Sequence, residues 1–156
     1  MSAEELDRIY THLPEVNLSY KPKVKLSLLP TVDTSTIAYE VLKYNWNADR
    51  LNMVEEFKVM FLNRCNKAIG IYHVSTGGIT GTVADPRLIL IAALKMNAVS
   101  MIVSHNHPSG ALKPSRADEE LTQKIKSAAT FLDIKLLDHI IITDEGFYSF
   151  ADEGII

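Results

Sequence analysis

The sequence predicts an α/β domain built on a mixed β-sheet that is flanked by helices. From Phe57 onward, strand-like segments are interspersed with two segments of helical periodicity, in the order β-β-α-β-α-β-β that is typical of this class. The chain has 156 residues, of which 47% are hydrophobic and 22% are charged, so its composition is that of an ordinary globular protein. A single domain of this length can bury a sizeable core.

Residues 1–31 are expected to form an N-terminal arm, and residues 32–156 the folded domain. The first twenty residues mix charged with isolated apolar positions, which suits an arm or a short helix. Residues 21–26 alternate as a strand would, and their three lysines suit a solvated edge, so the arm includes a possible edge strand. Residues 33–45 have helical spacing and are expected to form a helix.

The remaining elements follow from local patterns. Residues 57–62 and 68–75 have strand character on either side of a turn, which indicates a hairpin. Asp85 and Pro86 open a helix whose body is apolar on nearly every side, so we expect that helix to be buried. The other expected elements are a short apolar strand at 99–104, a helix that starts at Pro114-Ser115, and a second hairpin with strands at 134–143 and 147–150.

Charge and cysteine content exclude several classes of protein. A formal net charge of −3 gives no electrostatic argument for a nucleic-acid binder. The one cysteine, Cys65, cannot form an internal disulfide or a Cys-rich zinc site, so any metal must be held by histidines and carboxylates. The charged amino terminus has no apolar run behind it, and the longest apolar stretch, residues 88–94, is too short to span a bilayer. We therefore expect a cytoplasmic protein with no membrane association.

The residues that point to chemistry lie between His105 and Asp118. Two histidines two residues apart, His105 and His107, follow an apolar strand directly, and side chains at that spacing point the same way on an extended chain. Asp118 comes three residues after Ser115, the expected N-cap of the next helix, so its carboxylate can reach back toward the histidines. Two imidazoles, one carboxylate and an open fourth position are what a catalytic zinc requires.

Each part of this pattern also has an ordinary structural interpretation. Ser115 and Asp118 form a capping-box pattern, which alone would explain both residues as the start of a helix. A single histidine at the end of a strand is usually structural. The combination of all four residues favours a metal site over those separate explanations.

The same residues resemble a known family. His105, His107, Pro108, Ser115 and Asp118 match the metal signature of the JAMM (JAB/MPN) domain at each defining position. The resemblance runs from Val54 to the carboxyl terminus. The segments that resemble the RadC branch of that superfamily are Ser104 to Gly110, Ser115 to Asp118 and Leu137 to Ile141.

The resemblance implies that residues 32–156 form a RadC-like JAB/MPN domain, with the cytidine-deaminase-like fold of that superfamily. It implies one zinc ion per chain, held by His105, His107 and Asp118 together with a water molecule. It also implies that Ser115 helps to stabilise the oxyanion of the reaction. A zinc deaminase itself is excluded, because such an enzyme needs more cysteines than this chain has.

The resemblance further implies a general base on an upstream strand. RadC-like proteins carry Glu-x-Phe at the start of the first core strand, and Glu55 with Phe57 fits that pattern. Strand alternation places Glu55 on the side of Phe57, whereas Glu56 falls on the side of Lys58. We favour Glu55 as the base and keep Glu56 as the alternative. His139, next to Asp138 in a strand, is expected to support the structure or the site rather than bind the metal.

These assignments predict a zinc-dependent metallopeptidase or isopeptidase that hydrolyses an amide bond of a peptide or protein through an activated water. One alternative is a DNA-repair-associated RadC-like protein without direct peptidase activity, and another is a metal-binding scaffold for protein interactions. Direct DNA binding is doubtful, because the chain is acidic overall and has no glycine before Gly70 for the hairpin turn of a DNA-binding segment. The sequence leaves open whether the protein forms a homo-oligomer.

Overall fold

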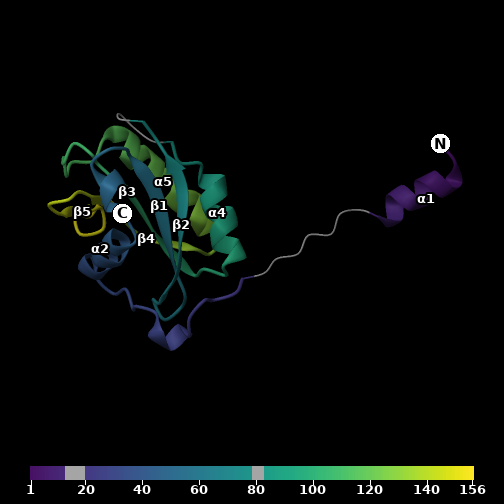
Figure 1. Ribbon diagram of the computed structural model, residues 1–156, viewed down its shortest axis with the longest axis horizontal. Helices are drawn as coiled ribbons and strands as arrows, with labels where there is room; N and C mark the ends of the chain where they lie inside the picture. The colour runs from purple at the N-terminus through teal and green to yellow at the C-terminus, as the bar shows by residue number, and fades with distance from the viewer. Residues whose placement is uncertain (13–19, 79–82) are drawn as a thin grey trace.

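A five-stranded mixed sheet forms the centre of the molecule (Figure 1). The computed structural model describes residues 1–12, 20–78 and 83–156. The strand order is β2-β1-β3-β4-β5, with β3 and β4 parallel and the other neighbours antiparallel. The strands are β1 (Glu56–Leu62), β2 (Ala68–Thr76), β3 (Ser100–Asn106), β4 (Lys135–Ile142) and β5 (Phe147–Ser149).

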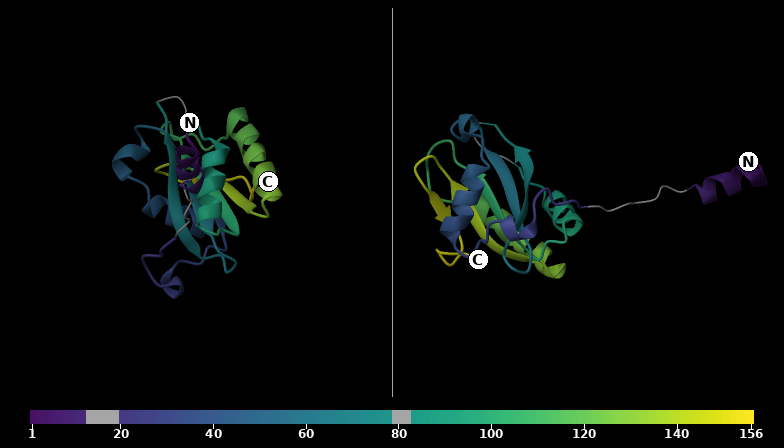
Figure 2. Two further views of the ribbon diagram at one scale, coloured as in Figure 1. Left: turned by 90° about the vertical axis from the view of Figure 1, so that its right-hand side faces the viewer. Right: turned by 60° about the horizontal axis from the view of Figure 1, so that its bottom comes forward.

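Helices cover both faces of this sheet, so the domain has three layers (Figures 1 and 2). Helices α4 (Pro86–Lys95) and α5 (Arg116–Phe131) pack on one face, against a core that includes Phe57, Val103 and Ile125. Helices α2 (Ser35–Tyr44) and α3 (Ala48–Leu51) pack on the other. The remaining elements are α1 (Ala3–Thr11) and a 3₁₀ turn at Leu26–Leu28. From β1 onward the order is β-β-α-β-α-β-β, which confirms the predicted α/β class with its mixed sheet.

The helices begin where their capping residues place them. The Thr34 side chain accepts a hydrogen bond from Ile37 N at the start of α2. Asp85 caps α4, and Pro86 occupies its first position, where a missing N–H costs nothing. Ser115 caps α5. Such caps satisfy backbone N–H groups that have no partner within the helix.

The expected edge strand at residues 21–26 is not present. That segment has no strand, and the chain forms the 3₁₀ turn at its end. Pro22 has no N–H to donate to a strand ladder, and the exposed lysines bury no apolar surface that would hold the segment against the sheet.

The expectation that α4 is buried is wrong for one side of the helix. Ile89 and Ala93 are fully buried, but Leu88, Ile91 and Leu94 are 44%, 62% and 50% exposed. A helix on the outer layer of a three-layer domain has one side against the sheet and one toward solvent, whatever residues it carries on the second side.

Strand β3 continues two residues beyond the predicted end, to Asn106. This extension places His105 inside the strand and His107 directly after it. Because β3 and β4 are parallel, the chain must cross back between them, and it does so through α5. The first turn of α5 therefore lies near the carboxyl end of β3, which is where α/β sheets usually carry their sites. Within the described ranges, no helix is long and apolar enough to cross a membrane.

Candidate metal centre

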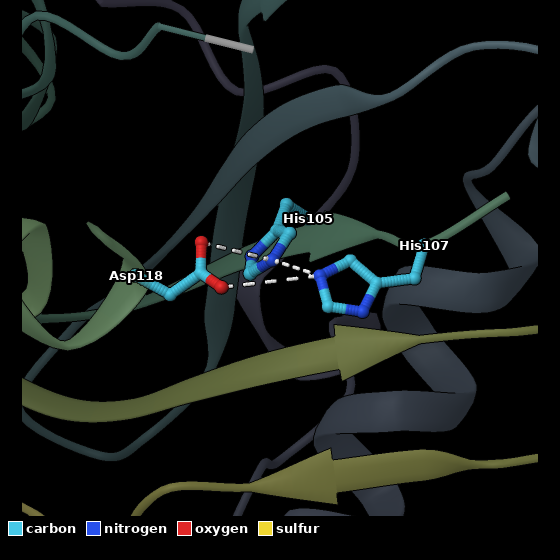
Figure 3. A group of neighbouring side chains, drawn as sticks. All are labelled: His105, His107 and Asp118. Atoms are coloured by element: carbon cyan, nitrogen blue, oxygen red, sulfur yellow. Dashed lines mark hydrogen bonds and ion pairs between the residues drawn. The ribbon is translucent and has the colours of Figure 1, made fainter. Parts of the chain in front are cut away.

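His105, His107 and Asp118 converge at the carboxyl end of β3 (Figure 3). One possible ligand atom from each residue lies within 4.8 Å of the others. The two Nε2 atoms of the histidines are 2.9 Å apart. Asp118 Oδ1 is 3.4 Å from Nε2 of His105, and Asp118 Oδ2 is 3.9 Å from Nε2 of His107. The structure thus brings together the three residues that the sequence predicts as ligands.

The backbone explains why these side chains meet. His105 pairs with Phe57 in the β1–β3 ladder, and the two rings lie parallel with centroids 6.1 Å apart. His107 lies two residues further on, so alternation directs it to the same side of the sheet. Asp118 occupies the first turn of α5 and faces both rings across the loop that joins β3 to α5.

When the His107 ring is neutral, its proton lies on Nδ1. His107 Nδ1 lies 2.6 Å from the carbonyl oxygen of Ala111, and a carbonyl can only accept. The proton of the neutral ring is therefore on Nδ1, and the lone pair on Nε2 points at His105 and Asp118. A hydrogen bond of this kind behind a histidine is typical of metal ligands.

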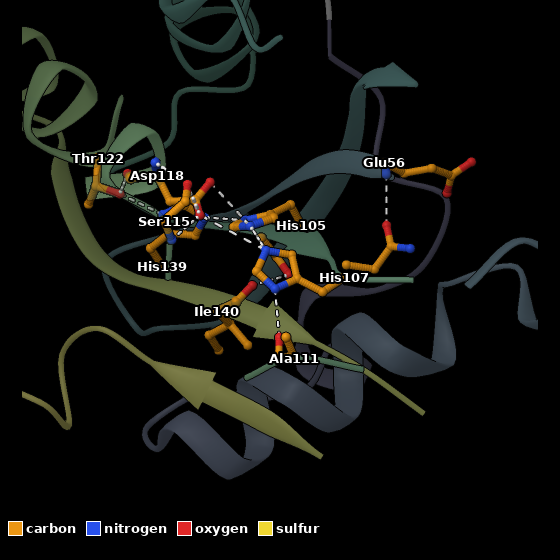
Figure 4. A network of polar contacts seen from close by, with 11 residues as sticks. Glu56, His105, His107, Ala111, Ser115, Asp118, Thr122, His139 and Ile140 are labelled. Carbon is orange, nitrogen blue, oxygen red and sulfur yellow. Dashed lines mark hydrogen bonds and ion pairs between the residues drawn. The ribbon is translucent and has the colours of Figure 1, made fainter. Parts of the chain in front are cut away.

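His105 is held from behind by a third histidine. Its Nδ1 lies 2.7 Å from Nε2 of His139, and Nδ1 of His139 lies 2.6 Å from the hydroxyl of Thr122 (Figure 4). His105 is 1% exposed, and His139 and Thr122 are fully buried. Burial lowers the pKa of His105 to about 4, against the opposite effect of Asp118, and burial also lowers the pKa of His139 well below its usual value. Both rings are therefore neutral at pH 7, the form in which a histidine nitrogen can bind a metal.

The three donor atoms suit a zinc ion. Bonds of 2.0–2.1 Å in a tetrahedral arrangement separate two donors by about 3.3 Å. The two Nε2 atoms, 2.9 Å apart, and the pair of His105 Nε2 and Asp118 Oδ1, 3.4 Å apart, lie close to that value. His107 and Asp118 are partly exposed, with 15% and 17% of their side-chain surface accessible. A fourth position on that side would be reachable by water and substrate, which is the pattern of a catalytic rather than a closed structural site.

Ser115 and Asp118 do form the capping box that the sequence allows. Asp118 Oδ2 accepts hydrogen bonds from the backbone N–H of Ser115 at 2.7 Å and from its hydroxyl at 2.6 Å. Ser115 Oγ in turn accepts from Asp118 N at 3.2 Å. The other oxygen of the same carboxylate faces His105. The capping role and the ligand role are thus compatible, because each uses a different oxygen.

Comparisons with known proteins show which family the chain resembles. The family model for the RadC-like JAB domain matches residues 32–155. The chain belongs to this family. Among curated relatives, a UPF0758 protein of Flavobacterium johnsoniae is 54% identical over 101 residues, covering 65% of this chain and 44% of the relative. A UPF0758 protein of Porphyromonas gingivalis is 47% identical over 103 residues, covering 65% of this chain and 45% of the relative. The chain therefore aligns with less than half of the length of these relatives.

The two candidate bases of this RadC-like JAB domain lie differently. Glu56 is 4% exposed, and its carboxylate pairs with Arg50 at 2.8 Å and with Lys58 at 3.5 Å. In Figure 4 this carboxylate points away from the histidines. Glu55 precedes β1, and its backbone pairs with Gly77 and with Gly78. Extending the β1–β3 register two residues beyond its last pair would set Glu55 opposite His107, so Glu55 remains the glutamate expected on the side of the histidines.

Asn106, between the two histidines, holds the segment that leads to Glu55. It is fully buried, and its side chain donates to the carbonyl oxygens of Leu51 at 2.6 Å and Val54 at 2.9 Å, while its Oδ1 accepts from Glu56 N at 2.7 Å. Sequence reasoning did not predict this function for Asn106 or a function for Thr122. The alternation of β3 could have indicated the first, since Asn106 must face away from the side that His105 faces. Thr122 lies four residues after Asp118, on the same side of the helix, and this spacing could have indicated a function for Thr122.

Proposed function

We propose that this chain is a zinc-dependent hydrolase of amide bonds, a metallopeptidase or isopeptidase acting on a peptide or protein. The observation that carries the proposal is the group of three converging donor atoms on His105, His107 and Asp118, with the Nδ1 atoms of both histidines already engaged behind them. A zinc ion bound there would lower the pKa of its water to about 7 and polarise the carbonyl of the substrate.

The side chains around the metal would have separate tasks. Glu55 would take the proton of the attacking water and pass it to the leaving amine, a contribution of about 10²- to 10⁴-fold in rate. The hydroxyl of Ser115, which donates to Asp118 in the free chain, would turn to the developing oxyanion. Retention of all three ligands, together with Glu55 and Ser115, supports a hydrolase over a metal-free scaffold.

Two variants separate metal binding from chemistry. We expect Glu55→Ala to keep one zinc per chain but to lose hydrolysis, and His107→Ala to lose the metal. Zinc is measured by elemental analysis of protein purified without added metal, and hydrolysis with a mixture of quenched fluorescent peptides. Glu56→Gln is the matched control: its carboxylate pairs with Arg50 and Lys58, so the folded variant should hydrolyse at the rate of the unmodified chain.

Each result bears on a different part of the proposal. Full activity in Glu55→Ala would show that the base is assigned wrongly. Absence of zinc from the carefully handled unmodified chain would contradict the metallohydrolase itself and favour an interaction scaffold. A salt-dependent shift of double-stranded DNA at physiological ionic strength would instead support the DNA-associated alternative.

A further inference from the structure

Thr122 and His139, the two buried residues behind His105, form a chain of hydrogen bonds in which the donors all point the same way. Thr122 Oγ1 lies 2.5 Å from the carbonyl oxygen of Asp118, one helical turn earlier, and 2.6 Å from Nδ1 of His139. His139 Nε2 lies 2.7 Å from Nδ1 of His105. A continuous line of polar contacts thus runs from the backbone of one ligand, Asp118, to the side chain of another, His105 (Figure 4).

The carbonyl at the start of this line determines where the protons lie. A hydroxyl has one proton, and a carbonyl can only accept, so the proton of Thr122 goes to Asp118 O. Thr122 Oγ1 must then accept from Nδ1–H of His139. The neutral His139 ring is left with a lone pair on Nε2, which accepts from Nδ1–H of His105. The neutral His105 ring is in turn left with its lone pair on Nε2, the atom that faces His107 and Asp118.

The opposite direction would disable the site. If His139 carried its proton on Nε2, it would donate to Nδ1 of His105, and the proton of His105 would then lie on Nε2. That proton would occupy the only nitrogen that faces the other ligands. The hydroxyl of Thr122 is what distinguishes the two directions, because it offers Nδ1 of His139 an acceptor.

We propose that Thr122 and His139 are positioning residues that hold His105 in its Nδ1–H tautomer and so keep Nε2 free to bind the metal. The inference rests on the proposed zinc site. It assigns a function to two buried polar groups that neither touch the ligand position nor serve the capping of α5. It also explains why a third histidine is fully buried in the core, stacked on Phe150 with ring centroids 4.5 Å apart.

Substitutions of Thr122 test the direction of the hydrogen bonds. Thr122→Val removes the hydroxyl and keeps the shape of the side chain, and we expect it to weaken zinc affinity about 10- to 100-fold. Thr122→Ser keeps the hydroxyl and should keep the affinity of the unmodified chain. Thr130→Val is the matched control, since Thr130 lies on the same helix and makes the same hydrogen bond to a carbonyl four residues earlier, Lys126 O at 2.8 Å, but is exposed about two turns beyond Thr122. Affinity is measured by competition with a chromophoric zinc chelator.

Substitutions of His139 test whether its Nε2 accepts the hydrogen bond from Nδ1–H of His105. His139→Phe keeps an aromatic ring against Phe57 and Phe150 but offers His105 no acceptor, and we expect the same loss of zinc affinity. His139→Gln can present its side-chain oxygen near the position of Nε2, and it should recover part of the affinity. The absorption spectrum of bound Co²⁺ should change in Thr122→Val and His139→Phe and remain unchanged in Thr130→Val. Circular dichroism and urea unfolding establish that each variant is folded before affinity is compared.

A readout without metal separates this inference from the proposed function. Nitrogen chemical shifts of the imidazoles in the metal-free protein should report Nδ1–H for His105 in the unmodified chain and a mixture of tautomers in Thr122→Val. If the unmodified chain binds zinc and folded Thr122→Val binds it equally well, the positioning role is wrong and the hydrolase proposal stands. If the unmodified chain binds no zinc, the hydrolase proposal fails, and an Nε2–H tautomer of His105 would overturn the positioning role as well.

Discussion

Replacing Asn106 by leucine should destabilise the domain severely, although Asn106 is not a metal ligand. Leucine has a similar shape but makes none of the three hydrogen bonds of this fully buried side chain, so the carbonyls of Leu51 and Val54 and the N–H of Glu56 lose their partner. Leaving a buried backbone group unpaired costs about 1–3 kcal/mol, so three such groups together cost at least about 3 kcal/mol. A domain with a total stability of about 5–15 kcal/mol would lose a large part of it.

Urea unfolding at pH 7, followed by circular dichroism, measures this loss. Asn52→Leu is the control, because Asn52 is exposed and makes one side-chain hydrogen bond, to Asp144 at 3.1 Å, so its replacement should change stability by no more than about 0.5 kcal/mol. The same order of loss in both variants would refute the reasoning, as would a loss below about 1 kcal/mol for Asn106→Leu. Either result would mean that the segment before β1 is held by its packing and not by Asn106.

Two further predictions concern pH and the start of α5. The metal-free chain should lose stability as pH falls from 6.5 toward 4, because burial holds the pKa of His105 at about 4 and the unfolded chain, with the ordinary value of 6.5, binds the proton first. The loss from His105 alone is about 2 kcal/mol at pH 5, and urea curves that coincide at pH 7 and pH 5 would contradict it. Ser115→Ala removes a helix cap and a hydrogen bond to Asp118, so thermal unfolding should show a loss of about 1 kcal/mol, together with weaker zinc binding. Ser115→Thr should retain both properties, and equal stability of the alanine and threonine variants would argue against a capping role.

Much of the fold follows from patterns that local physics controls. The strands from β1 onward are set by apolar alternation and by turns, and α4 and α5 begin at Asp85 and Ser115 because those side chains satisfy free N–H groups. The three proposed ligands were also predictable, because His105 and His107 are two residues apart on extended chain and Asp118 is fixed by its own helix cap.

Other features depend on contacts between distant segments, which a local pattern does not contain. The exposed side of α4 could not be told from its buried side, since Ile89 and Ile91 are equally apolar and only packing on the sheet distinguishes them. The four-residue helix α3 is too short to show periodicity, and it exists where Leu51 packs into the core on its face of the sheet. The contact between His139 and His105 joins residues 34 positions apart through the parallel pairing of β3 and β4.

The loop between β3 and α5 can change in length and sequence without moving the three proposed ligands. The histidines lie at its first end and Asp118 beyond its last, and each end is anchored in a regular element, while Ser109 to Lys113 are exposed. His107 forms a hydrogen bond with the carbonyl of Ala111, whereas Leu112 and Lys113 hold none of the three proposed ligands in place. Doubling the length of a flexible loop costs only about 0.6 kcal/mol. Extra residues can therefore be accommodated after Leu112, so that the surface beside the three proposed ligands can be altered while those residues keep their positions.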